Sequence, residues 1–156
     1  MRAVIQRVHG ASVSVDQEVI GTIVGPGLVI FVGIGIDDDI SKCAILAEKI
    51  WHLRIFESQS LKREGIAIES TAVEVCAADG NLPILLISQF TLFADTSGGR
   101  RPTWQQAASG TQAEPIFNEL LKSFRELGAT IATGQFGADM KITQVNDGPM
   151  TIILEV

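Results

Sequence analysis

The sequence has few of the residues on which disulfide frameworks and common catalytic sites depend. Among its 156 residues there are two cysteines and two histidines. Cys43 and Cys76 lie far apart and form no CxxC pair, and the first residues lack the apolar run and small-residue cleavage site of a secretory signal. We therefore expect a protein of the reducing cytoplasm.

Long hydrophobic runs are absent too. The longest apolar stretch, 28–36, falls far short of the roughly 20 residues that a membrane-spanning helix needs, so we do not expect an integral membrane protein. The formal net charge of −6 argues against a general nucleic-acid coat, because non-specific binding depends on neutralising phosphates. A local basic pair nevertheless occurs at Arg100 and Arg101.

What is present is the composition of a globular domain. The chain is 46% hydrophobic and 19% charged, with 15 glycines and 5 prolines, which excludes disordered, collagen-like and low-complexity proteins. A length of 156 residues is close to the usual size of one domain. Because no internal repeat or linker divides the sequence, we expect a single domain over 1–156.

The pattern of the first part of the chain predicts strands. Partial alternation of apolar and polar residues over 2–24, interrupted by a polar turn at Asp16-Gln17, predicts an antiparallel hairpin or meander. Gly-Pro-Gly at 25–27 is expected to break this pattern. The apolar run at 28–36 has no polar face, so it is expected to be a central strand buried on both sides.

Two helices and further strands are expected in the rest of the chain. Apolar residues recur at helical spacing over 40–53, after three aspartates at 37–39 that offer an N-cap and solvated charge. A second apolar stripe over 111–127 follows Thr111 and Glu114, which fit a capping box. Strands are expected at 71–75, 84–94, 129–136, 139–145 and 150–156, loops at 57–70 and 96–110, and a tight turn at 146–149. The predicted fold class is α+β, a largely antiparallel sheet or open barrel of about seven or eight strands with two packed helices.

The usual catalytic sets are mostly missing. A serine triad would need a histidine aimed at Ser88 or another serine, and His9 and His52 lie in unpromising settings. No group of histidine, cysteine and carboxylate residues has the spacing of metal ligands. The aspartates at 37–39 fit a helix cap better than a cation site, so we expect neither a metal nor a cofactor.

A run of polar residues interrupts the apolar segment at 84–94. Ser88, Gln89 and Thr91 flank Phe90 there, and a buried polar group without a partner costs about 1–3 kcal/mol. Two explanations stay open at this point. The polar groups bond to the backbone inside the core, or the end of the strand aims them, with nearby backbone N–H groups, into a pocket.

Two polar segments carry further candidates. Arg100 and Arg101 follow two glycines; a guanidinium suits phosphate oxygens and glycine permits close approach, although a solvated loop explains them equally well. The 146–149 segment contains the Gly148-Pro149 bond, where a cis peptide costs only about 0.5–1 kcal/mol relative to trans. A cis bond would turn two successive carbonyls to one side, where they would form a rigid wall without side chains. The simpler explanation of the segment is a turn that only joins two strands.

Together these segments resemble the D-aminoacyl-tRNA deacylase family over nearly the whole chain. The similar segments, in the same order, are MRAVIQRV, KIWHLRIF, SQFTLFAD, GGRRPTWQQA, GQFGADMKI and VNDGPMT. The resemblance implies a homodimeric cytoplasmic hydrolase that cleaves the ester between a D-amino acid, or glycine, and the terminal adenosine of tRNA. Two places depart from the family's pattern: 61–70 lacks a Met-Asn-x-Ser segment, and Trp104 stands where phenylalanine is usual.

The same resemblance implies roles for individual residues. Those expected to hold the terminal adenosine and the ester in the catalytic pocket are Ser88, Gln89, Phe90 and Thr91. Gly148 and Pro149 are expected to form a cis pair that enters the partner's pocket and excludes L-amino acids by a clash. Arg7 is expected to brace that pair, and Phe136 and Met140 to flank the pocket.

The implied chemistry does not need a catalytic histidine. The resemblance implies that the substrate's own ribose 2′-hydroxyl helps to activate water, and backbone N–H groups around Phe90 and Thr91 would stabilise the oxyanion. Nothing in the sequence supplies Thr91 with a base, so whether Thr91 acts chemically or only positions the substrate stays open. Three alternative functions stay open. The first is a non-catalytic RNA-binding domain, in which Arg100 and Arg101 hold phosphates and Phe90 or Trp104 stacks on a base. The others are a hydrolase that acts on D-amino acid esters without RNA, and a purely structural dimer.

Overall fold

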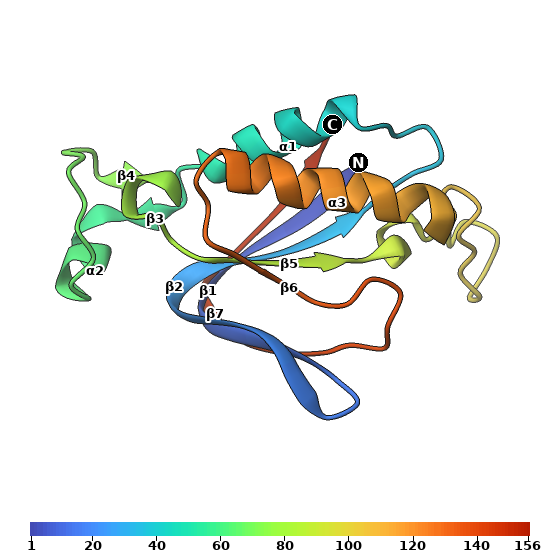
Figure 1. The fold of residues 1–156 in the computed structure, drawn as a ribbon, viewed down its shortest axis with the longest axis horizontal. Helices are drawn as coiled ribbons and strands as arrows, with labels where there is room; N and C mark the ends of the chain where they lie inside the picture. Colours follow the sequence, from blue (N-terminus) through green and yellow to red (C-terminus); the bar gives the residue numbers. More distant parts are fainter.

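The computed structural model describes all 156 residues and contains a five-stranded sheet with two long helices over one face (Figure 1). The order of strands across the sheet is β6-β5-β2-β1-β7. These strands are β1 (Arg2–Val15), β2 (Glu18–Gly33), β5 (Ile84–Ser88), β6 (Ile131–Thr133) and β7 (Lys141–Glu155). The remaining elements are α1 (Ser41–Trp51), α2 (Ser58–Arg63), α3 (Gly110–Glu126), the paired short strands β3 (Phe56–Glu57) and β4 (Glu74–Val75), and the 3₁₀ turns η1 (Ala78–Gly80) and η2 (Phe90–Phe93). The predicted α+β class is confirmed.

The N-terminal hairpin is confirmed as well. β1 and β2 pair antiparallel and are joined by Asp16 and Gln17, which have positive φ angles of 49° and 72°. β2 occupies the centre of the sheet, and its second half is almost continuously buried, as the apolar run predicts. The predicted break at 25–27 is wrong, because these residues lie within β2, where a register shift between His9 and Ala11 accommodates them.

The sheet is less antiparallel than predicted. β5 pairs in parallel with β2, and β6 pairs in parallel with β5. The carboxyl ends of these three strands therefore meet at one end of the sheet. Seven strands occur, within the predicted number, but only five belong to the main sheet, which stays open.

Three segments differ from the prediction. The strand expected over 84–94 ends at Ser88, and η2 follows because Gln89 leaves the strand conformation, with φ −146° and ψ 83°. The loop expected over 57–70 contains the short helix α2. The turn expected at 146–149 is a bulge inside the single strand β7. Between the pairs Gln6–Thr151 and Val8–Asn146, β7 has residues 147–150 where β1 has only Arg7.

The predicted helix caps are wrong too. α3 begins after Ser109, and no capping-box hydrogen bond from Thr111 forms. α1 begins after Ile40, while Asp39 accepts the backbone N–H of Ser41 at 2.8 Å. Asp38, expected to be solvated, is buried.

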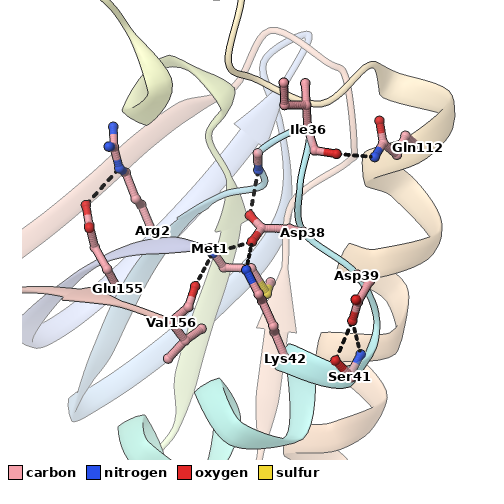
Figure 2. A network of polar contacts seen from close by, with 11 residues as sticks. Met1, Arg2, Ile36, Asp38, Asp39, Ser41, Lys42, Gln112, Glu155 and Val156 are labelled. Atoms are coloured by element: carbon pink, nitrogen blue, oxygen red, sulfur yellow. Dashed lines mark hydrogen bonds and ion pairs between the residues drawn. The ribbon is translucent and has the colours of Figure 1, made fainter.

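Asp38 is buried because it joins separate parts of the chain (Figure 2). Its Oδ1 accepts hydrogen bonds from the α-amino group of Met1 at 2.7 Å and from Lys42 Nζ at 2.6 Å, and its Oδ2 accepts the Gly35 N–H at 2.7 Å. The α-amino group also donates to the carbonyl of Val156 at 2.6 Å. Burial raises the pKa of this carboxyl, but the three donors outweigh burial and hold the pKa below its usual value.

The two faces of the sheet carry separate apolar clusters. A core of 29 buried residues lies between the sheet and the helices, and a smaller cluster of seven includes Val29, Leu85 and Ile87. Because neighbouring strand residues point to opposite faces, these three lie on the face away from the helices. No helix has both the length and the apolar character needed to cross a bilayer.

Candidate active site

A cavity of about 450 Å³ lies at the end of the sheet where the parallel strands stop. Its walls come from the end of β2, the end of β5 with η2, the segment after β6, and the start of α3. Open sheets with parallel strands commonly bind ligands at the carboxyl ends of those strands. The volume also lies within the roughly 300–1,000 Å³ of small-molecule sites. This cavity is therefore the candidate active site.

Five of the predicted site residues line the cavity, namely Ser88, Gln89, Phe90, Phe136 and Met140. Phe136 is positioned by the Phe117 ring of α3, whose centroid lies 5.9 Å from its own. A Cβ atom at Gly134 would collide with the sulfur of Met140, so glycine at this position makes room for the methionine. The catalytic roles of these residues stay predictions, but the end of β5 and the segment after β6 do bring them together.

The turn η2 presents backbone donors beside the cavity. Phe90 and Thr91 are its first residues, and the first N–H groups of a helix have no acceptor within that helix. Neither N–H donates to a carbonyl elsewhere in the chain. The N–H of Gln89, by contrast, donates to the carbonyl of Val32 at 2.8 Å and fixes the turn to the end of β2. Two free donors in this position suit an oxyanion.

Thr91 has no base beside it. It does not line the cavity, and its hydroxyl oxygen accepts a hydrogen bond from Gln89 Nε2 at 2.5 Å. Both histidines are paired elsewhere: His9 Nε2 lies 2.8 Å from the carboxylate of Glu64, and His52 Nδ1 lies 3.0 Å from that of Glu48. The site therefore contains no histidine-activated nucleophile.

Arg2, which sequence reasoning missed, clamps the turn from β1. Its Nη1 donates to the carbonyl of Leu92 at 3.1 Å, and its guanidinium carbon lies 4.6 Å from the centre of the Phe93 ring. The ring also lies against two glycines, since a Cβ at Gly33 or Gly35 would come within 3.0 Å or 2.8 Å of it. No local pattern could reveal Arg2, because the hydrogen bond joins residues 90 positions apart.

Gly148 and Pro149 lie outside the cavity of their own chain. Both are exposed in the bulge of β7, and the peptide bond between them is cis. The bulge lies opposite Arg7, which faces Leu28 at the start of the parallel β2–β5 ladder, whereas the cavity lies at the other end of that ladder. β1 and β2 separate β7 from β5 in the sheet. The structure therefore does not bring this pair to the cavity within one chain.

Arg7 holds the base of the bulge. Its Nη1 donates to the carbonyl of Ile55 at 2.6 Å. Its Nε lies 2.8 Å from the carboxylate of Asp147, an ion pair in which Nε makes no hydrogen bond. A Cβ at Gly148 would lie 3.0 Å from Arg7 Nη2, so the arginine touches the residue it is predicted to brace.

Asp139 is the one ionisable residue that lines the cavity, and sequence reasoning missed it. Its side chain is 92% exposed, with the carboxylate 3.4 Å from Lys141 Nζ. A carboxylate at the rim suits the α-ammonium group of an amino acid. No three histidine, cysteine, aspartate or glutamate residues gather as possible metal ligands, and the expectation of no metal stays a prediction.

The fold and the cavity define an α+β protein with a ligand-sized site at its strand ends, served by backbone donors rather than by a histidine. The family model described as D-Tyr-tRNA(Tyr) deacylase matches residues 4–155. Two relatives named D-aminoacyl-tRNA deacylase match over the full length of both chains, with 47% identity in Streptomyces coelicolor and 48% in Mycolicibacterium smegmatis. The chain belongs to the D-Tyr-tRNA(Tyr) deacylase family, which confirms the resemblance and, with it, the prediction of a hydrolase.

Two solved structures share the fold. The c-Myc DNA unwinding element binding protein is 35% identical, with a TM-score of 0.86 over 100% of this chain and 99% of that one. A probable eukaryotic D-amino acid tRNA deacylase is only 13% identical, but its TM-score of 0.80 over 99% of this chain and 98% of that one shows the same fold.

Proposed function

We propose that the chain acts in the cytoplasm as a homodimer that hydrolyses the ester between a D-amino acid, or glycine, and the terminal adenosine of tRNA. The observation that carries this proposal is the pair of free N–H groups, Phe90 and Thr91, beside a cavity lined by Ser88 and Gln89. The family assignment and the full-length relatives support the same substrate class.

The proposed chemistry asks little of protein side chains. Water attacks the carbonyl carbon, the bond from that carbon to the ribose oxygen breaks, and the ribose oxygen takes up a proton as the amino acid leaves. The free N–H groups stabilise the negative charge on the carbonyl oxygen. An aminoacyl ester is already reactive, so positioning of water, aided by the substrate's 2′-hydroxyl, replaces a strong protein base.

The dimer is supported by an uncovered face of the sheet. Val4 pairs with Phe31 on one side and with Ile153 on the other, so the three form an apolar row across β2, β1 and β7. Their neighbours Ala3 and Ile5 point into the helix-covered core, which places the row on the opposite face. Ile153 is 72% exposed. A second copy packed on this row would bury it.

Chiral selection is proposed to come from the partner. Gly148 and Pro149 are exposed and remote from the cavity of their own chain, and Gly148 lies against Arg7. In the dimer they would enter the partner's cavity, with their carbonyls where an L side chain would point. A D side chain points away, and glycine has none, so neither would be excluded.

The first test compares hydrolysis of D- and L-aminoacyl-tRNA that carry the same side chain, with glycyl-tRNA alongside, with and without a chelator. We expect loss of the D and glycyl esters, survival of the L ester and no effect of the chelator. Absence of hydrolysis of all three esters by a folded protein that still binds tRNA would favour the RNA-binding alternative. Equal turnover of D-aminoacyl-adenosine and D-aminoacyl-tRNA would favour a hydrolase that ignores RNA.

A mixing experiment tests the contribution of the partner. Pro149→Ala homodimers are expected to hydrolyse both the D and the L ester, and Gln89→Ala homodimers neither. In a mixed dimer, the intact cavity belongs to the Pro149→Ala chain and the intact 148–149 segment to the other. An excess of Gln89→Ala chain should therefore suppress L hydrolysis and spare D hydrolysis; L hydrolysis that persists in mixed dimers contradicts the proposal.

A further inference from the structure

Phe90 and Trp104 form an exposed aromatic pair at the mouth of the cavity. Their ring centroids lie 5.7 Å apart at an interplanar angle of 62°. Phe90 is 57% and Trp104 is 40% exposed, whereas every other aromatic side chain of the protein is buried or half-buried. The two rings contact each other but leave much of their apolar surface in water, so burial in the core does not explain the pair.

The position of the pair relates it to the cavity. Phe90 lines the cavity and Trp104 does not, so the pair leads from the cavity wall outward. Trp104 follows a hairpin-like loop that is closed at its base by two backbone hydrogen bonds between Asp95 and Thr103, 2.8 and 2.9 Å long. In Figure 1 this loop projects at the end of the molecule where β5 stops and α3 starts.

The loop that precedes Trp104 carries positive charge. Arg100 and Arg101 are exposed and make no ion pair or hydrogen bond, in a chain whose net charge is −6. A Cβ at Gly98 or Gly99 would meet no atom within 4 Å, so the loop backbone is open to close approach. The nearby carboxylate of Asp95 accepts the backbone N–H of Ser97 at 2.8 Å. Flat aromatic faces at the base of a loop that carries unpaired guanidinium groups match a nucleotide, which has a base and a phosphate.

We propose that Phe90 and Trp104 form a stacking surface for the unpaired nucleotides that precede the terminal adenosine of tRNA, with Arg100 and Arg101 on their phosphates. This inference rests on the proposed function, because it assumes that the terminal adenosine occupies the cavity. Single-stranded RNA is recognised in general by aromatic stacking and by cations along the backbone. The occupant is therefore RNA rather than an apolar protein segment, which would leave the two arginines without a counterpart.

Binding of an unacylated oligonucleotide tests this surface without any reaction. The probes are the ribonucleotides ACCA and AMP, titrated against the full chain while tryptophan fluorescence is recorded. Trp51 is buried, so a change on binding reports Trp104. We expect ACCA to quench the fluorescence and to bind at least about five-fold more tightly than AMP, because each stacked base contributes.

Variants separate stacking from folding. Trp104→Ala should weaken ACCA binding about five-fold or more, whereas Trp104→Phe should restore most of the affinity, as followed by calorimetry. The double variant Arg100→Ala/Arg101→Ala should reduce the slope of log K against log salt by about 1.4, or about 0.7 for each phosphate of a single strand. The matched control Arg125→Ala removes a charge about 22 Å along α3 from the cavity residue Gly110 and should leave the slope unchanged.

Kinetics tie the surface to the reaction. With D-aminoacyl-tRNA, Trp104→Ala should raise KM, and the loss should be smaller with D-aminoacyl-adenosine. Equal ACCA affinity of Trp104→Ala and the parent chain overturns this inference, even if both hydrolyse D-aminoacyl-tRNA. Fluorescence that depends on protein concentration but not on ACCA overturns it too, since a second copy then covers the pair. Oligonucleotide binding without hydrolysis would instead contradict only the proposed reaction.

Discussion

Replacement of Asp38 by asparagine should destabilise the protein by about 3 kcal/mol at pH 7, the lower end of the usual cost of breaking a buried ion pair. The side chain is 5% exposed and accepts hydrogen bonds from two cationic groups and one backbone N–H (Figure 2). An asparagine has one acceptor oxygen and one NH₂ group. Whichever way the amide is turned, the NH₂ faces a donor, either the Gly35 N–H or the two ammonium groups.

The magnitude follows from what is left behind. The fully buried α-amino group of Met1 would keep only the carbonyl of Val156 as an acceptor. Removal of one partner from a buried ion pair typically costs about 3–5 kcal/mol, and the asparagine side chain retains part of the hydrogen bonding, so we take the lower end. For a chain of this length, a loss of about 3 kcal/mol lowers Tm by about 6–12 °C.

Chemical denaturation at several pH values measures this effect. The pKa of Asp38 is lowered in the folded protein, so its stabilisation is complete above the pKa of an unfolded aspartate, about 3.9, and is lost as the pH falls through the lower folded value. The gap in free energy of unfolding between the parent and Asp38→Asn should therefore begin to close below about pH 4 and narrow further as the pH falls through the folded pKa. Asp37→Asn, an exposed neighbour, should stay within about 0.5 kcal/mol of the parent. A gap under about 1 kcal/mol at pH 7, or one that does not narrow as the pH is lowered from about 5 to about 2, would refute this reasoning.

Two further predictions concern packing and thiol chemistry. Gly27→Ala should lower the free energy of unfolding in denaturant by about 1–3 kcal/mol, because its Cβ would lie 2.5 Å from the carbonyl oxygen of Pro83. Gly98→Ala, whose Cβ would lie in open space, should change this free energy little. Equal losses in the two variants would count against the packing argument. Burial raises the pKa of Cys43 to about 11 and also raises that of Cys76, so the thiolate fractions at pH 8 are small. Mass spectrometry should detect no iodoacetamide adduct at pH 8 without denaturant and two with it; rapid labelling of the folded protein would contradict this.

The hairpin, the central strand and the two long helices could be predicted because their signals are local. Alternation over 2–24 and helical spacing over 111–127 each lie within the element that they specify. The parallel pairing of β5 with β2 could not, since it joins Leu28 to Ile84 through a long connection. The cavity was foreseeable only in part for the same reason: the polar run at Ser88 and Gln89 marks one wall, whereas the other walls come from distant strand ends.

Turn residues misled the prediction at 146–149. Asn-Asp-Gly-Pro satisfies the rules for a chain reversal, but the same residue types fit a bulge, which also accommodates a glycine at positive φ and a proline without an N–H. Gly148 has a φ of +114° within β7. The burial of Asp38 was missed because one of its cationic partners, the fully buried α-amino group of Met1, lies 37 residues away. Lys42 is local, but no local window contains the second cation that the buried carboxylate pairs with.

Arg2 gives a test of whether the turn η2 acts through its position. Its guanidinium touches the turn twice, at the Leu92 carbonyl and the Phe93 ring, and pairs with Glu155 at 2.7 Å on the exposed side. A hydrogen bond from a charged group contributes about 1.5–3 kcal/mol and a cation–π contact about 0.5–1 kcal/mol. If about 1.4 kcal/mol of this positions the free N–H groups for the transition state, Arg2→Gln should lower kcat about ten-fold.

The way in which the loss divides between kcat and KM decides the interpretation. Donors that act on the oxyanion contribute only in the transition state, so KM for D-aminoacyl-tRNA should change little in Arg2→Gln. Glu155→Gln breaks the exposed ion pair but leaves both contacts with the turn, and should lower kcat less than about two-fold. Two results would contradict this interpretation: an equal loss of kcat in Glu155→Gln and Arg2→Gln, or the parent kcat in Arg2→Gln. In either case Arg2 does not position the N–H donors of η2. The geometry of the turn would then depend on the hydrogen bond between Gln89 and Val32 at the end of β2.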